Sequence, residues 1–366
     1  MDYDERLFYT IGLGLLEGIG PVNARKLIAF AGSAEQVFKQ KRHQLMRTPG
    51  VGEVIASAIH TGVLERAEKE MEFIRRNKIR ASTFLDSAFP QRLKNCEDAP
   101  LVLFSLGNTD FNTSRIVSIV GTRQPSEKGK EICATLVEQL AGKGITVVSG
   151  LAYGIDICAH RTSLQHAIPT VGVLAHGLDR IYPGAHRSTA EKMLEQGGLL
   201  TEFISETNPD RENFPKRNRI VAGMSDATIV IETGNKGGSI ITAMLANDYN
   251  RDVFAFPGRP GDEKSSGCNR LIKIHRAALT ENANDILLTM GWEENNSKKN
   301  AIQIPLFPDL DPDEKTIYDL LHENNPTGID ALCMRSNWPM SKVSALLLTM
   351  EFKGVVKSFP GKLYGV

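Results

Sequence analysis

The feature that most constrains this chain is an alternation of short apolar strands with helical segments, which starts near residue 114. The segments 126–143 and 155–166 have helical character. Strands without polar interruptions are typical of a parallel sheet that helices cover on both faces. Right-handed crossovers then give an α/β fold, a Rossmann-like doubly wound parallel sheet. The strands are expected at 116–120, 145–149, 170–174, 226–231 and 252–256.

The residues before this region predict a small helical domain over 1–80. Two of its pieces, 15–24 and 45–56, place an apolar-Gly-apolar-Gly turn between helical stretches. Such helix-hairpin-helix turns leave backbone N–H groups open at a helix start and can hold a DNA phosphate. A plain corner between two helices explains them equally well. The second domain is expected over 81–291, with residues 101–104 as an edge strand.

The residues after the sheet predict a linker and a third domain. Polar residues and prolines over 292–312 argue against packing, so this stretch is expected to be the linker. The order helix, short helix, helix and two short strands over 313–366 suits a winged-helix domain. Lys and Arg do not outnumber Asp and Glu there, whereas a winged helix that grips DNA is normally basic. A role in protein contact or packing is therefore at least as well supported.

Composition limits the setting in which this chain works. No run of 18 apolar residues is present, so we expect no membrane span. The first residues lack a basic region followed by an apolar stretch, so we expect no signal peptide. The five cysteines are scattered and never form a CxxC pair, which favours free thiols and a cytoplasmic protein. The chain has 43 basic and 43 acidic residues, so any nucleic-acid site must be a local basic pocket.

Two glycine-containing stretches follow predicted strands, at the edge of a doubly wound sheet where ligands bind. Gly121-Thr122-Arg123 offers open amides, a hydroxyl and a bidentate phosphate donor. Ser149-Gly150 with Tyr153 belongs to a loop that could form an anion nest. It lacks the Gly-x-Gly-x-x-Gly fingerprint of a dinucleotide site. Both stretches are also compatible with ordinary strand-to-helix loops.

The third stretch, 211–219, carries four positive charges and one negative charge. It adds Phe214, which can stack on a base, and Pro215, where we expect a helix to begin. A solvated charged turn would mix the signs of charge more evenly. The fourth stretch places Gly238-Ser239 at a helix start without the order of a Walker A loop.

Signs of catalysis are absent from the sequence. The eight histidines show no metal-binding spacing, so no metal and no cofactor are expected. No nucleophile with a base and an orienting group can be nominated, so no catalytic residue is proposed. Asp156 and His160 lie four apart on one helical face, where a structural hydrogen bond is more common than a catalytic pair.

These stretches, in this order and spacing, resemble the DNA-processing protein A (DprA/Smf) family. The residues that carry the resemblance span about 85–290: Val120–Arg123, Ser149–His160, Gly177–Pro183, Phe214–Arg219, Gly238–Ala243, Phe256–Gly258 and Ser266–Ile272. The flanks resemble the family's SAM-like N-terminal domain and winged-helix C-terminal domain with lower specificity. The family pattern often has Arg or Lys where Tyr153 stands, although a tyrosine could stack on a base.

The resemblance implies an extended Rossmann fold that forms a homodimer, binds single-stranded DNA and is not an enzyme. It implies that the protein protects incoming DNA and loads the RecA recombinase during natural transformation or recombination. By position, phosphates would meet Arg123, Lys216, Arg217 and Arg219, and bases would meet Phe214 and Asn218. The DNA backbone would pass Gly121, Thr122, Ser149, Gly150, Gly238 and Ser239.

Two rivals to this interpretation remain. Related Rossmann-like proteins hydrolyse nucleoside monophosphates at a Pro-Gly-Gly-x-Gly-Thr-x-x-Glu motif, which Gly237-Gly238-Ser239 resembles only at its start. The second rival is a structural adaptor that works through its winged helix. This hypothesis predicts that loss of charge at Arg217 and Arg219 leaves the protein's function unchanged.

Overall fold

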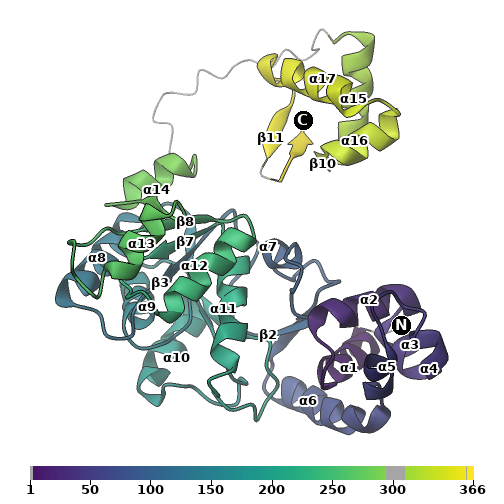
Figure 1. The fold of residues 1–366 in the computed structure, drawn as a ribbon, viewed down its shortest axis with the longest axis horizontal. Coiled ribbons are helices and arrows are strands. Elements are labelled where there is room, and N and C mark those ends of the chain that lie inside the picture. Colours follow the sequence, from purple (N-terminus) through teal and green to yellow (C-terminus); the bar gives the residue numbers. More distant parts are fainter. Residues whose placement is uncertain (1–2, 294–309, 360) are drawn as a thin grey trace. The chain divides into compact units, whose positions relative to one another are not determined.

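The computed structural model describes residues 3–293, 310–359 and 361–366 (Figure 1). The chain divides into two compact units, Met1–Trp292 and Glu293–Val366. Within the described residues, no helix is both long and apolar enough to cross a membrane. The predicted domain borders at residues 80 and 291 stay predictions, as does the linker, most of which lies outside the described residues.

The first unit is built on a nine-stranded sheet within the described part of the chain, in the order β1-β2-β6-β5-β4-β3-β7-β8-β9. All neighbours from β6 to β9 are parallel, whereas β1 and β2 are antiparallel to their neighbours. The strands are β1 Arg80–Thr83, β2 Val102–Gly107, β3 Arg115–Val120, β4 Ile145–Ser149, β5 Thr170–Val173, β6 Gly198–Thr201, β7 Ala227–Val230, β8 Asp252–Ala255 and β9 Ala278–Leu279.

The strand order confirms the predicted doubly wound fold. From β3 the chain runs through β4 and β5 to β6, then returns to the other side of β3 for β7, β8 and β9. The carboxyl ends of β3 and its neighbours therefore meet where the strand order reverses, which is where α/β folds bind ligands. The predicted strands over 116–120, 145–149, 170–174, 226–231 and 252–256 agree with β3, β4, β5, β7 and β8 to within one residue at each end.

One strand prediction was wrong in its position in the sheet. The strand expected at 101–104 is β2, which lies inside the sheet because β1 pairs with its outer side. The four residues of β1, Arg-Ala-Ser-Thr, carry no apolar run that would have marked them as a strand. The edge position instead belongs to this short, partly polar strand, in keeping with the way natural sheets protect their edges.

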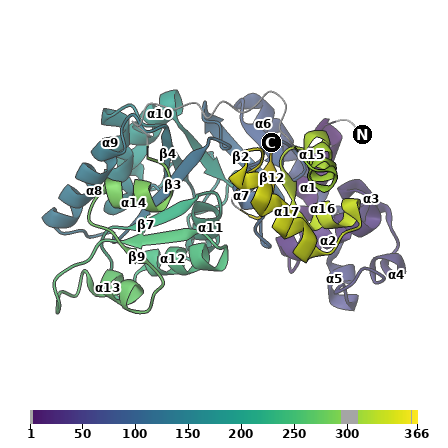
Figure 2. The same cartoon turned by 90° about the horizontal axis from the view of Figure 1, so that it is seen from above.

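Helices cover both faces of the sheet. Helices α8, α9 and α14 share one core with the strands, and α11, α12 and α13 contribute to the core on the other side. Figure 2 shows α8 and α9 on one side of β3 and β7, with α12 on the other. Helix α10 packs on α9 and β6. Their bounds are α8 Glu127–Gln139, α9 Ile155–Gln165, η2 Gly184–His186, α10 Arg187–Gln196, α11 Asn213–Gly223, α12 Gly238–Asp248, α13 Ser266–Lys273 and α14 Ala283–Thr289.

The N-terminal helices share a continuous hydrophobic core with the sheet. The two glycine turns of the sequence lie between helices, with Gly20 capping α2 and Gly52 capping α5 in extended conformations. Arg66 on α6 donates to the carbonyl oxygen of Ser205, which ties the helices to the sheet. The helices are α1 Tyr3–Gly14, α2 Pro21–Ala31, α3 Ala34–Lys39, α4 Arg42–Leu45, α5 Glu53–Ala58, η1 Thr61–Val63, α6 Leu64–Arg76 and α7 Gln91–Lys94.

The second unit has the helix and strand order of a winged helix, as the sequence predicts. Asp311 caps its first helix in a capping box with Glu314. The buried Glu314 carboxylate accepts two hydrogen bonds of 2.6 Å from Lys353. The elements are α15 Pro312–Glu323, β10 Thr327–Gly328, α16 Ile329–Ser336, α17 Met340–Phe352, β11 Lys357–Phe359 and β12 Leu363–Gly365.

Candidate nucleic-acid interface

The loops after β3, β4 and β7 meet at the carboxyl edge of the sheet. The Thr122 N–H donates to the carbonyl oxygen of Glu232 at 2.7 Å, and the Ile155 N–H donates to that of Thr122 at 3.2 Å. The loops that hold the first two stretches singled out in the sequence are thus bonded together, and the first is also bonded to the loop that leads to the fourth, Gly238-Ser239. The helix that holds the third stretch, α11, contacts both β5 and α12.

The glycines of these loops serve contacts within the protein. A Cβ atom on Gly121 would lie 2.5 Å from Cγ1 of Ile155, so only glycine lets α9 pack this closely on the loop. Gly154 has φ +84° and leaves no room for a side chain beside the Thr122 carbonyl. The backbone at Gly121 therefore approaches the first residue of α9.

Ser149 and Arg217, two predicted DNA contacts, lie in the interior. The Ser149 hydroxyl is fully buried and donates to the carbonyl oxygen of Ile119 at 2.6 Å. The Arg217 side chain is buried, and its Nη1 donates to the carbonyl oxygen of Gly150 and, at 2.6 Å, to that of Val173. In this conformation neither side chain is open to a ligand.

The Arg217 guanidinium is balanced by a buried carboxylate. Asp156 interacts electrostatically with Arg217 and accepts hydrogen bonds from the backbone N–H groups of Gly150 and Ala152 at 3.1 and 3.4 Å. Burial lowers the pKa of Arg217 to about 10, so the side chain stays charged at neutral pH. Burial also raises the pKa of Asp156, and the Arg217 charge opposes that rise. The pair anchors the loop after β4 to α11.

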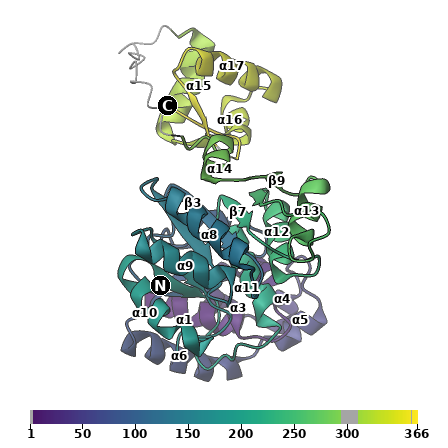
Figure 3. The same cartoon turned by 90° about the vertical axis from the view of Figure 1, so that its left-hand side faces the viewer.

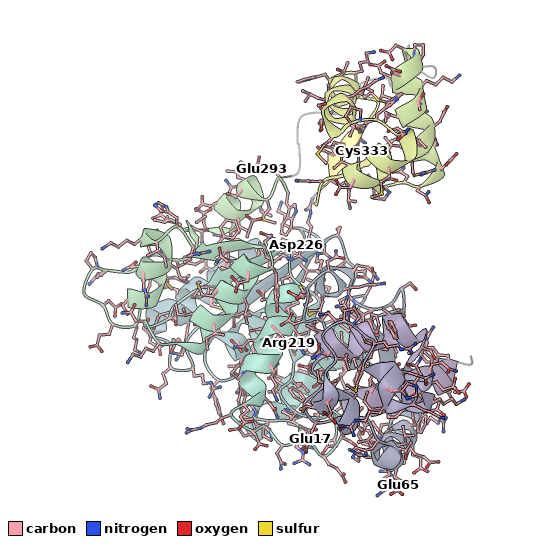
Figure 4. All side chains as sticks on the ribbon, turned by 45° about the vertical axis from the view of Figure 1, so that its right-hand side comes forward. Glu17, Glu65, Arg219, Asp226, Glu293 and Cys333 are labelled. Atoms are coloured by element: carbon pink, nitrogen blue, oxygen red, sulfur yellow. The ribbon has the colours of Figure 1, made fainter. Side chains whose placement is uncertain are left out.

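Arg219 holds a different part of the fold. Its guanidinium pairs with Glu202 after β6 and donates to the carbonyl oxygen of Asp98 at 2.6 Å. Figure 4 shows Arg219 on α11 at the side that faces the N-terminal helices. The lining of a 530 Å³ cavity there includes Arg219, Lys216 and Glu202. Two of the three arginines that the resemblance assigns to phosphates, Arg217 and Arg219, are thus engaged by the protein.

Five accessible side chains around this edge define the surface called the ledge. They are Arg123, Tyr153, Tyr182, Phe214 and Lys216. The Arg123 guanidinium lies 5.0 Å from the Phe214 ring centroid, and the Tyr182 and Phe214 centroids are 6.4 Å apart. Tyr153 and Tyr182 are about half exposed, at 51% and 48%. Aromatic rings that solvent can reach can stack on the bases of a single strand, and the cations beside them can contact its phosphates.

Tyr182 was not predicted from the sequence as a site residue, nor were the histidines His176 and His186 that hold the loops beside it. The Tyr182 N–H donates to Nε2 of His176 at 3.2 Å, which fixes the loop after β5. His186, buried, places Nδ1 2.9 Å from the carbonyl oxygen of Leu151 and contacts the Tyr153 ring edge-on at 4.8 Å. The signal was present, because an aromatic residue before a proline follows a buried strand.

The remaining predicted residues take mixed positions. Asn218 is partly buried, and its Oδ1 accepts from Nε of Arg217 at 3.1 Å. Gly238 is exposed at the start of α12, whereas Ser239 is buried and its hydroxyl has no partner among the described residues. Pro215 is the third residue of α11, not its first, since the helix begins at Asn213. The basic cluster still lies in the first turns of this helix, as predicted.

His160 supports the structural interpretation of the Asp156–His160 pair. Its ring is fully buried, with Nδ1 2.7 Å from the Thr170 hydroxyl. Burial lowers the pKa of His160 to about 3, and the charges of Arg217 and His186 act in the same direction. A histidine that stays neutral and enclosed packs the core beneath the ledge.

The low pKa of His160 predicts an acid-sensitive fold. The unfolded chain takes up a proton near pH 6.5 that the folded state refuses until about pH 3, so stability falls as pH drops through this window. Between pH 7 and pH 5.5, wild type should lose about 1 kcal/mol more than His160→Gln. Urea unfolding at both pH values measures the difference. Parallel losses in the two proteins would contradict the assignment.

The Glu232 carboxylate at this edge serves the fold. Glu232, at the end of β7, is buried, and its Oε2 accepts from the Ser126 hydroxyl at 2.6 Å, with a further bond from the Ser126 N–H. The carboxylate therefore holds the start of α8. Among residues 3–293, 310–359 and 361–366, no group of three His, Cys, Asp or Glu side chains could hold a metal ion.

Comparison with known proteins agrees with this arrangement. The family model of DNA recombination-mediator protein A matches residues 80–291, and that of the DprA winged helix domain matches 305–362. Protein Smf of Synechocystis is 31% identical, over 97% of this chain and 98% of its own. DNA processing protein A of Streptococcus pneumoniae has a solved structure with a TM-score of 0.66 and 29% identity, covering 77% of this chain and 97% of that one.

A second solved structure is that of DNA processing protein A from Helicobacter pylori, which concerns the single-stranded DNA binding mode of that protein. Its TM-score is 0.53 at 31% identity, with coverage of 58% of this chain and 95% of the other.

Proposed function

This chain belongs to the DNA recombination-mediator protein A family, and on that basis we propose that it binds single-stranded DNA at the ledge without reading the base sequence. The observation that carries the proposal is the grouping of Arg123, Phe214 and Tyr182 at the carboxyl edge of the sheet. Stacking and phosphate contacts carry little sequence information, so any single strand fits.

The position of each charge assigns its role. Arg123 and Lys216 are exposed, and no ion pair ties either of them within the described residues. They are the phosphate contacts in this proposal, while Phe214, Tyr182 and Tyr153 offer their rings to bases. Arg217 and Arg219 support the surface from within. The predicted contacts at Gly238, Ser239 and Asn218 stay secondary, because their polar groups are small or already bonded.

Removing the two exposed charges tests the proposal. Each of Arg123→Ala and Lys216→Ala should lower the salt dependence of binding by about 0.7 in the slope of log K against log salt. Fluorescence anisotropy with a labelled dT oligonucleotide over a salt series measures this slope. Lys69→Ala, at an exposed lysine on α6, is the matched control and should leave the slope unchanged.

Failure of a folded wild-type protein to bind would remove the proposal and favour the hydrolase alternative. Release of a nucleobase from AMP above background would then identify an enzyme. If binding persists in both charge variants with an unchanged slope, single-stranded DNA binds elsewhere on the chain.

We propose further that the protein protects incoming DNA, loads the RecA recombinase and works as a homodimer in the cytoplasm. The family resemblance supports these roles. A dimer would join two ledges along one strand and raise avidity without new contacts. Analytical ultracentrifugation tests the dimer. Faster RecA filament formation on DNA precoated with a single-strand-binding protein tests loading.

A further inference from the structure

Two of the five cysteines face each other across adjacent helices. Cys133 is in the second turn of α8 and Cys158 in the first turn of α9. These helices pack directly on one another, and Figure 3 shows them side by side. Cys133 is fully buried, whereas Cys158 is partly exposed. One thiol is therefore open to a small reagent while its neighbour is protected.

The thiols make reciprocal contacts between the helices. The Cys133 thiol donates to the carbonyl oxygen of Ile155, three residues before Cys158, at 3.9 Å. The Cys158 thiol lies 3.6 Å from the carbonyl oxygen of Lys130, three residues before Cys133. Each sulfur thus sits against the turn that carries the other.

The two thiols differ in acidity. The neighbouring Cys133 thiol lowers the pKa of Cys158, and Thr162, Lys130 and Arg161 add to this effect against the opposing effect of burial. The neighbouring Cys158 thiol, together with burial, raises the pKa of Cys133. Cys158 is consequently the nucleophilic thiol and Cys133 the resolving thiol, as in cysteine pairs that sense peroxide.

We propose that Cys133 and Cys158 are a modification site, a dithiol that a peroxide closes reversibly to a disulfide between α8 and α9. The Cys158 thiolate attacks one peroxide oxygen, the O–O bond breaks, and hydroxide leaves to take up a proton as water. The resulting sulfenic acid loses a second water when the Cys133 sulfur attacks it and gives up its proton. Overall, two thiols are oxidised and one hydrogen peroxide is reduced to two waters.

The other cysteines lack these features. Cys96 and Cys268 are buried, and burial raises the pKa of each thiol. Cys333 in the second unit is partly exposed like Cys158. Cys333 is therefore the matched control for exposure without a neighbouring thiol.

Peroxide treatment of the reduced full-length protein tests the site independently of DNA binding. Wild type should lose two of its five free thiols, yield a peptide that links Cys133 to Cys158, and recover with dithiothreitol. Cys333→Ser should behave in the same way, whereas Cys158→Ser should form no link. In Cys133→Ser, dimedone should trap Cys158 as a sulfenic acid. Iodoacetamide should modify Cys158 about tenfold faster than Cys333 at pH 7.

Circular dichroism on every variant distinguishes a loss of thiol reactivity from a failure of the variant to fold. The proposal is overturned if folded wild type accumulates dimedone-reactive Cys158 without the linked peptide. It is equally overturned if Cys158 reacts no faster than Cys333.

Discussion

Replacement of Arg217 with alanine should lower the free energy of unfolding by about 3–5 kcal/mol, the usual effect of leaving a buried charge uncompensated. The substitution leaves the Asp156 carboxylate without its buried counter-charge. It also leaves the carbonyl oxygens of Gly150 and Val173 without their donor. Urea denaturation followed by circular dichroism measures the loss. Lys216→Ala, one position earlier and exposed, should change stability by less than about 0.5 kcal/mol.

The loss at Arg217 should depend on pH in a defined direction. Burial already raises the pKa of Asp156, and removing Arg217 removes the interaction that opposes this rise. The folded variant then keeps a proton on Asp156 at pH values where the unfolded chain has released it, so its stability falls as pH rises. The deficit relative to wild type should therefore be larger at pH 8 than at pH 5. A deficit below about 1 kcal/mol at every pH would show that Arg217 is free to serve DNA.

Loss of the Phe214 ring should weaken binding of a dT oligonucleotide by about tenfold to a hundredfold, because stacking on one base contributes roughly 1–3 kcal/mol. Phe214 contacts both the Arg123 guanidinium and the Tyr182 ring, so its removal also takes away the ring that Arg123 packs against. Anisotropy titrations of Phe214→Ala at fixed salt give the affinity. The salt slope should stay at the wild-type value, since no charge is removed.

Phe214→Tyr is the control, because it keeps a ring of the same shape and should bind within about threefold of wild type. Tyr182→Ala should weaken binding less than Phe214→Ala, because it leaves the Phe214 ring and its contact with Arg123 in place. An oligonucleotide with abasic sites should reduce the difference between Phe214→Ala and wild type. Equal losses on normal and abasic strands would show that the ring acts through packing, without meeting a base.

The sheet was predictable where burial alone sets the residue choice. Strands such as Ile145–Ser149 are buried at every position. A parallel strand that helices cover on both faces therefore consists mainly of apolar residues, which the sequence shows directly. β6, Gly198–Thr201, was missed because a four-residue strand that begins with glycine resembles a turn. β1 was missed because an edge strand needs few apolar residues.

The site was predictable as a location but not as a set of roles. The basic cluster of α11 does lie at the expected edge, yet its consecutive residues point in different directions around the helix. Lys216 faces solvent, Arg217 faces the core, and Arg219 meets Glu202 from a segment that precedes the cluster by several residues. A charge count along the sequence weighs all three equally. Only the tertiary partners, Asp156 and Glu202, distinguish the arginines that support the fold from a lysine that is free to contact DNA.

The backbone bonds that join the loops after β3, β4 and β7 also decide which partner becomes ordered when a strand binds. These loops are already fixed to one another through Thr122, Glu232 and Ile155, so the protein loses little conformational freedom. The loss of conformational freedom falls on the nucleic acid, whose bases must unstack from one another before they can stack on the rings of the ledge. A pyrimidine tract that stacks poorly on itself should then be favoured over an adenine tract of equal length, a preference that arises from the polymer and needs no hydrogen bond to any base.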